Sequence, residues 1–236
     1  MKLDLKRITA VGFFGRGDDW GQYKQTTERI DKILTYMLKT IDFAEIVMVS
    51  TYKPKVEGIR HIQINPVTYI EFNKWCLHEF GNYVNSDYGL RFEDDGFPLN
   101  PEFWDDEFLN YDYVGAPCRT TDGIQYAQEQ IGGGGFTLRS KRLVEYTKTI
   151  DYDNKTNEDT IISFYKRDEI VSLGMKICPH TIARKFVVQN PLDESHTIET
   201  SFGFHSRVVH MNDAERILDL KLSNLTNEVM TNAKII

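Results

Sequence analysis

The chain has 236 residues, 41% of them hydrophobic and 12% aromatic, and its 28 Lys and Arg against 35 Asp and Glu give a formal charge of −7. This balance excludes a generally basic nucleic-acid binder and a globally disordered chain, although a local basic groove stays open. No apolar run approaches the roughly 20 residues that span a bilayer. Because the first residues show no signal-peptide pattern and the three scattered cysteines form no disulfide set, we expect a cytoplasmic protein.

Strand-like and helix-like segments alternate through the first hundred residues. Short apolar runs predict strands, and apolar residues at helical spacing predict helices between them. The predicted strands are 7–14, 45–50, 61–64 and 88–93, and the predicted helices are 30–41 and 67–83. Strands separated by helices imply right-handed crossovers, so we expect an α/β fold with a mostly parallel central sheet flanked by helices.

The second half is less regular. Strands are predicted at 113–117, 175–178, 186–188 and 202–205, and helices at 140–149, 157–173 and 212 to about 222. No internal repeat, low-complexity tract or linker interrupts this pattern. A single domain is therefore the simplest organisation.

The strand predicted at 88–93 runs directly into Glu93, Asp94, Asp95 and Gly96. Because side chains alternate along a strand, Glu93 and Asp95 point to one side and Asp94 to the other. Two carboxylates at the carboxyl end of a parallel strand lie where such sheets bind ligands, and Mg²⁺ or Mn²⁺ accepts such ligands together with substrate phosphates. The alternative is an ordinary acidic turn after a strand.

Two glycine-rich stretches are candidates for close approach of backbone to a ligand. The run from Gly132 to Gly135 allows such an approach, and the alternative is a flexible loop. Arg16, between Gly15 and Gly17 after the first strand, either meets a phosphate or lies in solvent. Neither stretch matches a phosphate-loop or dinucleotide-binding pattern.

Two acids and a histidine complete the candidates. Thr156 and Asp159 resemble a capping box at the start of the helix predicted at 157–173. The alternative is that Asp159 or Glu158 takes a proton from an attacking hydroxyl, which requires that the carboxylate face a cleft. His205, flanked by aromatic residues, is either a core residue or a ligand.

In their order along the chain, these segments resemble a family of bacterial and phage glycosyltransferase-like domains with the GT-A fold. The resemblance covers roughly residues 70–206 and rests on the ordered combination of segments. The matching segments are FNK at 72–74, FEDDGF at 92–97, YDYVGAP at 111–117, GGFTLRS at 134–140, NED at 157–159, ARKF at 183–186 and FGFH at 202–205.

The resemblance implies a single GT-A-like domain over 1–236. Its nucleotide-binding half would cover about 1–117, its acceptor and catalytic half about 118–210, and a C-terminal helix and tail 211–236. The implied activity is transfer of a sugar from a nucleotide-sugar donor with the help of a divalent metal, Mn²⁺ or Mg²⁺. The acceptor would be a glycan, a lipid-linked sugar, a protein or a modified nucleic-acid base.

The resemblance also implies roles for individual residues. Asp95 and His205 would bind the metal, together with Glu93, which stands where the family usually has the first Asp of a D-x-D-like pair. Asp159 would be the general base of an inverting reaction, with Glu158 as the competing candidate. The residues expected to contact the donor are Glu93, Asp94, Gly134, Gly135 and Arg16.

This chemistry is coherent, and two other functions compete with it. A metal neutralises the charge that builds up on a leaving diphosphate, and an aligned carboxylate base contributes about 10²–10⁴-fold. A nucleotidyltransferase would instead attack the α-phosphate, but the loop around Arg16 is a poor version of the basic loop such enzymes carry. A catalytically silent nucleotide-sugar or glycan-binding module is disfavoured by the joint presence of Asp95, Asp159 and His205.

The negative charge of the chain is local. Residues 93–112 contain eight acids and no Lys or Arg, whereas the other 216 residues carry 28 basic and 27 acidic side chains. The acidity therefore begins at the expected metal site. The other 216 residues are nearly neutral together, so they can still form a basic groove that binds a phosphate-bearing acceptor.

Overall fold

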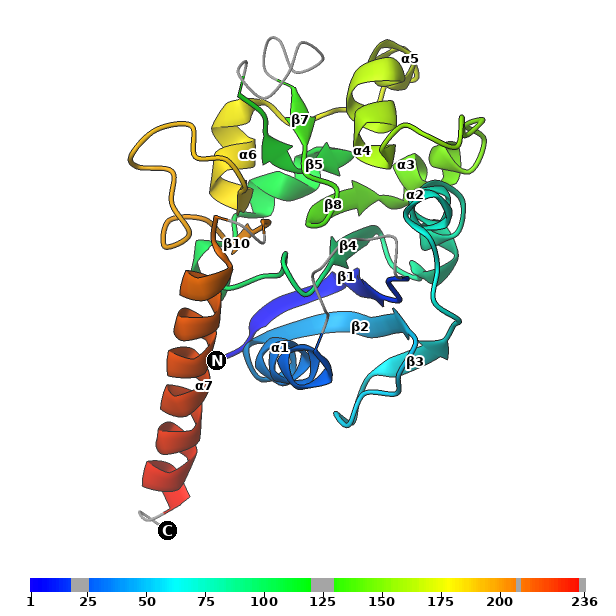
Figure 1. The fold of residues 1–236 in the computed structure, drawn as a ribbon. Coiled ribbons are helices and arrows are strands. Elements are labelled where there is room, and N and C mark those ends of the chain that lie inside the picture. The colour runs from blue at the N-terminus through cyan, green and yellow to red at the C-terminus, as the bar shows by residue number, and fades with distance from the viewer. Residues whose placement is uncertain (18–25, 120–129, 207–208, 234–236) are drawn as a thin grey trace.

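A computed structural model describes residues 1–17, 26–119, 130–206 and 209–233. Six strands form its central sheet: β1 (Leu3–Phe14), β2 (Ile41–Ser50), β3 (Arg60–Gln63), β4 (Tyr88–Phe92), β5 (Tyr113–Val114) and β8 (Thr137–Ser140). Their order is β3-β2-β1-β4-β8-β5 (Figure 1). The first four run parallel, and β8 runs antiparallel to both of its neighbours. This confirms the predicted mostly parallel α/β sheet.

Helices and two small strand pairs surround this sheet. The α-helices are α1 (Thr27–Thr40), α2 (Tyr69–His78), α3 (Lys141–Thr147), α4 (Glu158–Thr160), α5 (Arg167–Ser172), α6 (His180–Phe186) and α7 (Met211–Ala233). The 3₁₀ helices are η2 (Phe80–Tyr83), η3 (Pro101–Phe103) and η4 (Asp106–Asn110), and η7 (Ile161–Tyr165) is a π-helical turn. The small pairs join β6 (Ala116–Pro117) to β7 (Ile131–Gly132), and β9 (Val187–Val188) to β10 (Gly203–Phe204).

Both faces of the sheet are buried under helices. On β1, Ile8 and Ala10 face the apolar residues of α1, whereas Val11 and Phe13 face α2, η2 and α3. The alternation along β1 therefore builds two separate cores, as expected for a sheet covered on both sides. Helix α7 packs beside α1, where Lys32 pairs with Asp219 at 3.1 Å, and then extends beyond the body of the molecule (Figure 1). Among the described residues, no helix is both long and apolar enough to cross a membrane.

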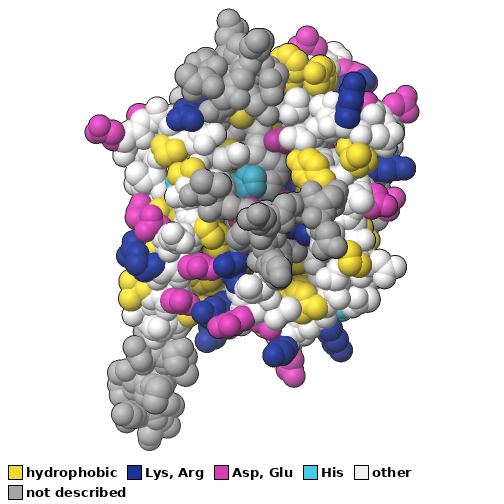
Figure 2. Space-filling model, in the orientation of Figure 1, with side chains coloured by type: hydrophobic (Ala, Val, Ile, Leu, Met, Phe, Trp, Pro, Cys, Tyr) yellow, Lys and Arg dark blue, Asp and Glu magenta, His cyan; other side chains and the backbone are white. Residues whose placement is uncertain are grey.

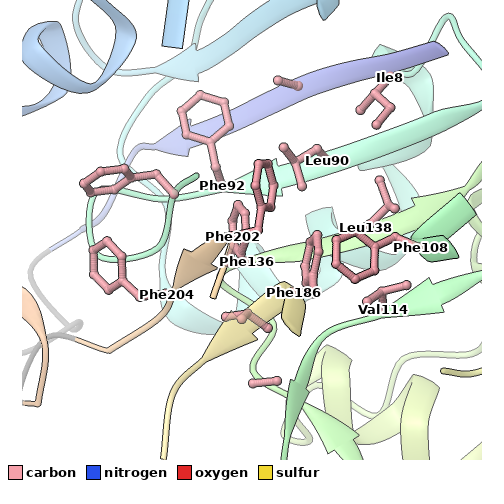
Figure 3. Close-up of a cluster of buried hydrophobic side chains, with 14 of the residues drawn as sticks. Ile8, Leu90, Phe92, Phe108, Val114, Phe136, Leu138, Phe186, Phe202 and Phe204 are labelled. Carbon is pink, nitrogen blue, oxygen red and sulfur yellow. The ribbon is translucent and has the colours of Figure 1, made fainter. Parts of the chain in front are cut away.

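An aromatic cluster fixes the second half of the chain to the sheet (Figure 3). The rings of Phe136 and Phe186 stack with their centroids 4.9 Å apart, and Phe202 lies 5.8 Å from Phe186. Phe204 meets the edge of Phe97 at 4.9 Å. All five side chains are fully buried. Because large aromatic side chains bury much area in specific geometry, this cluster fixes β10, and with it the residue that follows, against the end of β4.

Several predicted elements need correction. The strand predicted at 175–178 is only a single bridge, between Ile177 and Tyr113. The strand predicted at 113–117 splits at Gly115 into β5 and β6, which belong to different sheets. The helix predicted at 157–173 is broken by the π-helical turn η7, and α7 continues well past 222. Strand β8 and helix α6 were not predicted.

Candidate active site

A cavity of about 660 Å³ lies where β1 and β4 end, and nearly all of the predicted site residues line it. The predicted residues on its wall are Arg16, Glu93, Asp95, Gly134, Gly135, Glu158, Asp159 and His205. Asp94 is the exception. On the described part of the face shown in Figure 2, acidic and basic side chains are interspersed and a histidine lies near the middle. The structure thus gathers residues that lie more than 180 positions apart in the sequence.

A tight turn positions the acids that follow β4. Glu93 and Gly96 exchange backbone hydrogen bonds of 2.7 and 3.2 Å, so the strand ends at Phe92 and the acidic-turn alternative also holds. Glu93 and Asp95 face the cavity, as the predicted alternation requires. Asp94 lies fully buried behind the turn, with Arg29 3.7 Å from its carboxylate. Asp94 was expected to contact the donor, but it lies outside the cavity wall, and the two do not agree.

Arg16 reaches from the end of β1 into these acids. Its Nη2 lies 2.7 Å from Glu93 Oε2, 3.2 Å from Asp95 Oδ1 and 3.3 Å from Asp94 Oδ1. The side chain is only 4% exposed, so the alternative that it lies in solvent is wrong. Burial and the Glu93 carboxylate raise the pKa of Asp95 to about 7, despite the opposing effect of Arg16. Arg16 therefore does not fully compensate the negative charge beside Asp95.

Glu158 also lines the cavity, between two buried arginines. Arg139 on β8 donates from Nη2 to Glu158 Oε1 at 2.8 Å, and Arg91 on β4 donates to the same oxygen. Arg91 also bonds Glu93, so it links the two acidic groups. Burial alone would raise the pKa of Glu158, but the two guanidinium groups more than offset it and lower the pKa. This carboxylate is ionised and already engaged, which favours Asp159 over Glu158 as the base.

Asp159 is held by backbone groups instead. Its Oδ1 accepts a hydrogen bond of 2.8 Å from the Thr160 N–H, and its Oδ2 accepts one of 3.2 Å from the Gly134 N–H. Burial and the neighbouring charge of Glu158 raise its pKa. A carboxylate with a raised pKa that borders a cavity has the properties of a general base.

The capping box predicted from Thr156 and Asp159 is wrong. Thr156 instead donates from its hydroxyl to Asp153, at 2.5 Å. The start of α4 is satisfied from another element: Asn73 Oδ1, on α2, accepts the Glu158 N–H at 2.9 Å. Asp159 therefore does not serve as part of a capping box. The hydrogen bond with α2 orients the segment that carries Asp159 instead.

The glycine run forms a floor that has no room for side chains. A Cβ on Gly134 would lie 2.5 Å from Glu158 Oε1, and one on Gly135 would lie 2.1 Å from His205 Nε2. Gly133 has φ of +71°, which side-chain-bearing residues rarely adopt. The glycines are therefore required by packing, and the flexible-loop alternative does not describe them.

His205 lies on this floor rather than in the hydrophobic core. Its Nδ1 is 3.1 Å from Gln189 Oε1, and burial lowers its pKa, so the ring is neutral. Donation from Nδ1 to Gln189 leaves Nε2 as the nitrogen with a lone pair. Sequence reasoning gave no role to Gln189, Arg139, Asn73 or Arg91. Asn73 and Arg139 lie in the matching segments FNK and GGFTLRS, and Arg91 lies two residues before Glu93 and so shares its side of β4.

The carboxyl oxygens fit a hard divalent cation that arrives with a phosphate-bearing ligand. Among the described residues, no three His, Cys, Asp or Glu side chains are arranged as a ready-made metal centre. Mg²⁺ and Mn²⁺ commonly take one or two carboxylates and complete their shell with water and substrate phosphates. Glu93 and Asp95, which face the cavity together, supply such a partial set.

Solved structures similar to this fold include glycosyltransferases. A glycosyltransferase involved in the glycosylation of the major capsid of PBCV-1 has a TM-score of 0.50 and 11% identity, over 90% of this chain and 98% of that chain. This likeness shows the fold alone, and it confirms the predicted glycosyltransferase-like α/β fold class. The glycosyltransferase GlyE of Streptococcus pneumoniae TIGR4 has a TM-score of 0.44 and 11% identity, over 95% of this chain and 63% of that chain.

A third structure is a cytidylyltransferase from Leptospira borgpetersenii serovar Hardjo-bovis, with a TM-score of 0.36 and 14% identity over 76% of each chain. No curated protein matches the chain. A family model described as "Protein of unknown function (DUF5672)" matches residues 66–205, more than half of the sequence, and that range holds every residue given as lining the cavity except Arg16. The chain therefore belongs to the DUF5672 family.

Proposed function

We propose that the protein is a metal-dependent glycosyltransferase, which moves a sugar from a nucleotide-sugar donor to an acceptor hydroxyl. One observation carries the proposal: Glu93 and Asp95 from the end of β4 and Asp159 from α4 face the same cavity. Carboxylates for a metal and a carboxylate base are the two groups this reaction needs. A glycosyltransferase-like fold supports it.

The charge around the cavity supports the need for a cation. Among the described residues, four guanidinium groups in and behind its wall face five carboxylates, which leaves a formal charge of −1. An anionic diphosphate would be repelled unless positive charge came with it. Glu93 and Asp95 would hold Mn²⁺ or Mg²⁺, with His205 beside them. When bound, the metal would neutralise the charge on the leaving diphosphate.

Asp159 is the proposed base. Its two oxygens each accept one backbone hydrogen bond, and each keeps a lone pair for an acceptor hydroxyl. The Gly134 N–H fixes the carboxylate at the cavity wall, so the proton of the hydroxyl moves to a positioned oxygen. Direct attack by the activated hydroxyl would invert the anomeric carbon. The acceptor would be a glycan, a lipid-linked sugar, a protein or a modified nucleic-acid base.

A thermal-shift screen of nucleotide sugars, with and without Mn²⁺, tests the proposal. A ligand at 100 times its dissociation constant stabilises the fold by about 2.7 kcal/mol, which raises the melting temperature visibly. We expect at least one nucleotide sugar to do so, more strongly with Mn²⁺. If no nucleotide sugar shifts the melting temperature, the proposal is wrong. Release of pyrophosphate instead of a nucleoside diphosphate would identify a nucleotidyltransferase.

The variant Asp159→Asn separates catalysis from binding. We expect the donor-induced shift to persist and the transfer rate to fall by about 10²–10⁴, because the amide cannot take the proton. The rate is measured as nucleoside diphosphate released from the donor found in the screen. Asp168→Asn, an exposed acid on α5, is the matched control and should keep both properties. Loss of the donor shift in Asp159→Asn would indicate that this residue holds the fold rather than the proton.

A further inference from the structure

Arg16 holds a fixed place beside the strand-end acids. Its backbone is fastened on both sides, because the Gly17 N–H donates to Val67 O and the Val67 N–H donates to Gly15 O, each at 2.9 Å. From this anchor one nitrogen, Nη2, lies within 3.3 Å of three carboxylates. The loop therefore delivers a positive charge to one point, and that point is where oxygens of Glu93 and Asp95 converge.

A metal bound by these oxygens would compete with Arg16. Mg²⁺ lies about 2.1 Å from its oxygen ligands, so an ion held by Glu93 Oε2 and Asp95 Oδ1 would be a near neighbour of Nη2. Two positive charges this close repel each other strongly in a partly buried site, and a divalent ion repels more strongly than a monovalent one. The guanidinium and the metal therefore exclude each other from this point.

A diphosphate offers Arg16 another partner. Arg16 lines the same cavity as the glycine floor, and a planar guanidinium binds phosphate oxygens through paired hydrogen bonds. We propose that Arg16 acts as a resident cation on Glu93, Asp94 and Asp95, and that it transfers to the donor diphosphate when the metal takes its place. This inference rests on the proposed function, and it makes metal and nucleotide bind as a pair.

Coupled binding has a measurable signature. If the nucleotide relieves the competition for the carboxylates, it raises the affinity for Mn²⁺, and Mn²⁺ raises the affinity for the nucleotide by the same factor. We expect this factor to be about 10-fold or more, within the usual range of coupling between sites. Mn²⁺ alone should bind the wild-type protein weakly, because it has to displace an arginine that three carboxylates hold.

Titration with Mn²⁺ alone, followed by calorimetry or by the resonance signal of free Mn²⁺, tests the competition. Arg16→Gln should bind Mn²⁺ about 10-fold more tightly than the wild type, because the competing charge is gone. Arg29→Gln is the matched control: it removes a guanidinium that pairs with Glu215 and lies 3.7 Å from Asp94 Oδ2, whereas Arg16 contacts Asp94 Oδ1. Its Mn²⁺ affinity should change much less. Equal or weaker Mn²⁺ binding by Arg16→Gln would overturn the inference.

Two further arms keep the test decisive. If Arg16→Gln does not fold, Arg16→Lys replaces it, because the shorter ammonium group competes less well; its Mn²⁺ affinity should still exceed that of the wild type, and equality would overturn the inference. Repeating the titration with UDP, GDP, ADP or CDP should strengthen Mn²⁺ binding in the wild type and have a smaller effect in Arg16→Gln.

The two proposals fail in different experiments. A wild type that responds to no nucleotide sugar refutes the transferase, whatever Mn²⁺ does. A wild type that binds nucleotide and Mn²⁺ without coupling, or an Arg16→Gln variant that gains no affinity for Mn²⁺, refutes only the exchange of Arg16 for the metal.

Discussion

The two acidic groups of the cavity share their arginines differently. After β4, one nitrogen of Arg16 is shared by three carboxylates, whereas at α4 two guanidinium groups converge on one oxygen of Glu158. Arg91 also pairs with Glu93 and Arg29 approaches Asp94, but the pKa of Asp95 is still raised to about 7, so negative charge beside Asp95 is left for a cation. The second group is complete, since both arginines are buried on a carboxylate that needs nothing more. Both groups consist of buried acids and arginines, but we expect the acids after β4 to bind a cation and the group around Glu158 to stabilise the fold.

The roles of neighbouring residues follow from this contrast. Glu158 and Asp159 are adjacent in sequence, but only Glu158 is bracketed by arginines. Asp159 receives backbone N–H groups and keeps a raised pKa, partly because the charge of Glu158 is fixed beside it. A fixed, ionised neighbour therefore makes Asp159 a stronger base than an isolated Asp would be.

The largest expected effect comes from Glu158→Ala. Removing this carboxylate leaves Arg91 and Arg139 buried without their shared partner, and breaking a buried pair from one side costs about 3–5 kcal/mol. The free energy of unfolding, measured by urea denaturation at neutral pH, should fall by that amount.

Glu145→Ala is the matched control for this loss. Glu145 also pairs with two cations, Lys141 and Lys148, but its side chain is 50% exposed. Exposed pairs contribute about 0–1 kcal/mol. If the two variants lose equal stability, Arg91 and Arg139 on Glu158 stabilise the fold no more than a surface pair does. The two acidic groups would then not differ in their contribution to stability.

A smaller effect is expected from Gly135→Ala, on the floor between the two groups. The added methyl would lie 2.1 Å from His205 Nε2, so the imidazole would have to move. Overpacking of this kind costs about 1–3 kcal/mol, measured as the change in the free energy of unfolding. In a His205→Ala background the obstacle is gone, and most of this cost should disappear. An unchanged cost in that background would show that the glycine is required for another reason.

The first half of the fold could be predicted because its strands are long apolar runs. Alternation of strands and helices predicted the parallel sheet but not the strand order β3-β2-β1-β4, in which no helix separates β2 from β3. The caps at Thr26 and Thr68 mark where α1 and α2 begin. The strands missed or misjudged in the second half have two to four residues, as in β6, β7 and β8. Such short strands exist because of partners distant in sequence, and no local pattern encodes that pairing.

The site was predictable in its residue types and not in its ion pairs. Acids after a strand, a glycine run and a late histidine are visible in the sequence, and the structure places them around one cavity. Arg91 and Arg139 lie on the buried strands β4 and β8, where charged side chains are rare. Their partner, Glu158, becomes evident only when β4, β8 and α4 meet, so sequence reasoning kept Glu158 as the competing candidate beside Asp159.

Asp112 has a full set of hydrogen-bond partners but is less deeply buried than Glu158. Replacing it therefore tests which of these two properties sets the loss of stability, and we expect the smallest effect here. It accepts hydrogen bonds from Arg142 Nη2 at 2.7 Å, from Ser140 at 2.5 Å and from the Lys176 N–H at 2.7 Å, so it is as complete as Glu158. Its arginine, however, is 54% exposed. Asp112→Asn should therefore cost about 1–2 kcal/mol at pH 7, less than a buried bracket, since charged hydrogen bonds are worth about 1.5–3 kcal/mol before screening by solvent.

The stability that Asp112 contributes should fall as the pH is lowered. Burial alone would raise the pKa of Asp112, but Arg142, Ser140 and the Lys176 N–H lower it below the ordinary value of 3.8. A carboxylate whose pKa is lower in the folded state contributes stability that is complete above its unfolded pKa and is lost as the pH falls through the folded value. The difference in unfolding free energy between the wild type and Asp112→Asn should be constant from pH 7 to about 5 and shrink below pH 4. If the difference is undiminished at pH 3, Asp112 stabilises the fold through its packing and not through its charge. A full set of hydrogen-bond partners would then not explain why Glu158 stabilises the fold.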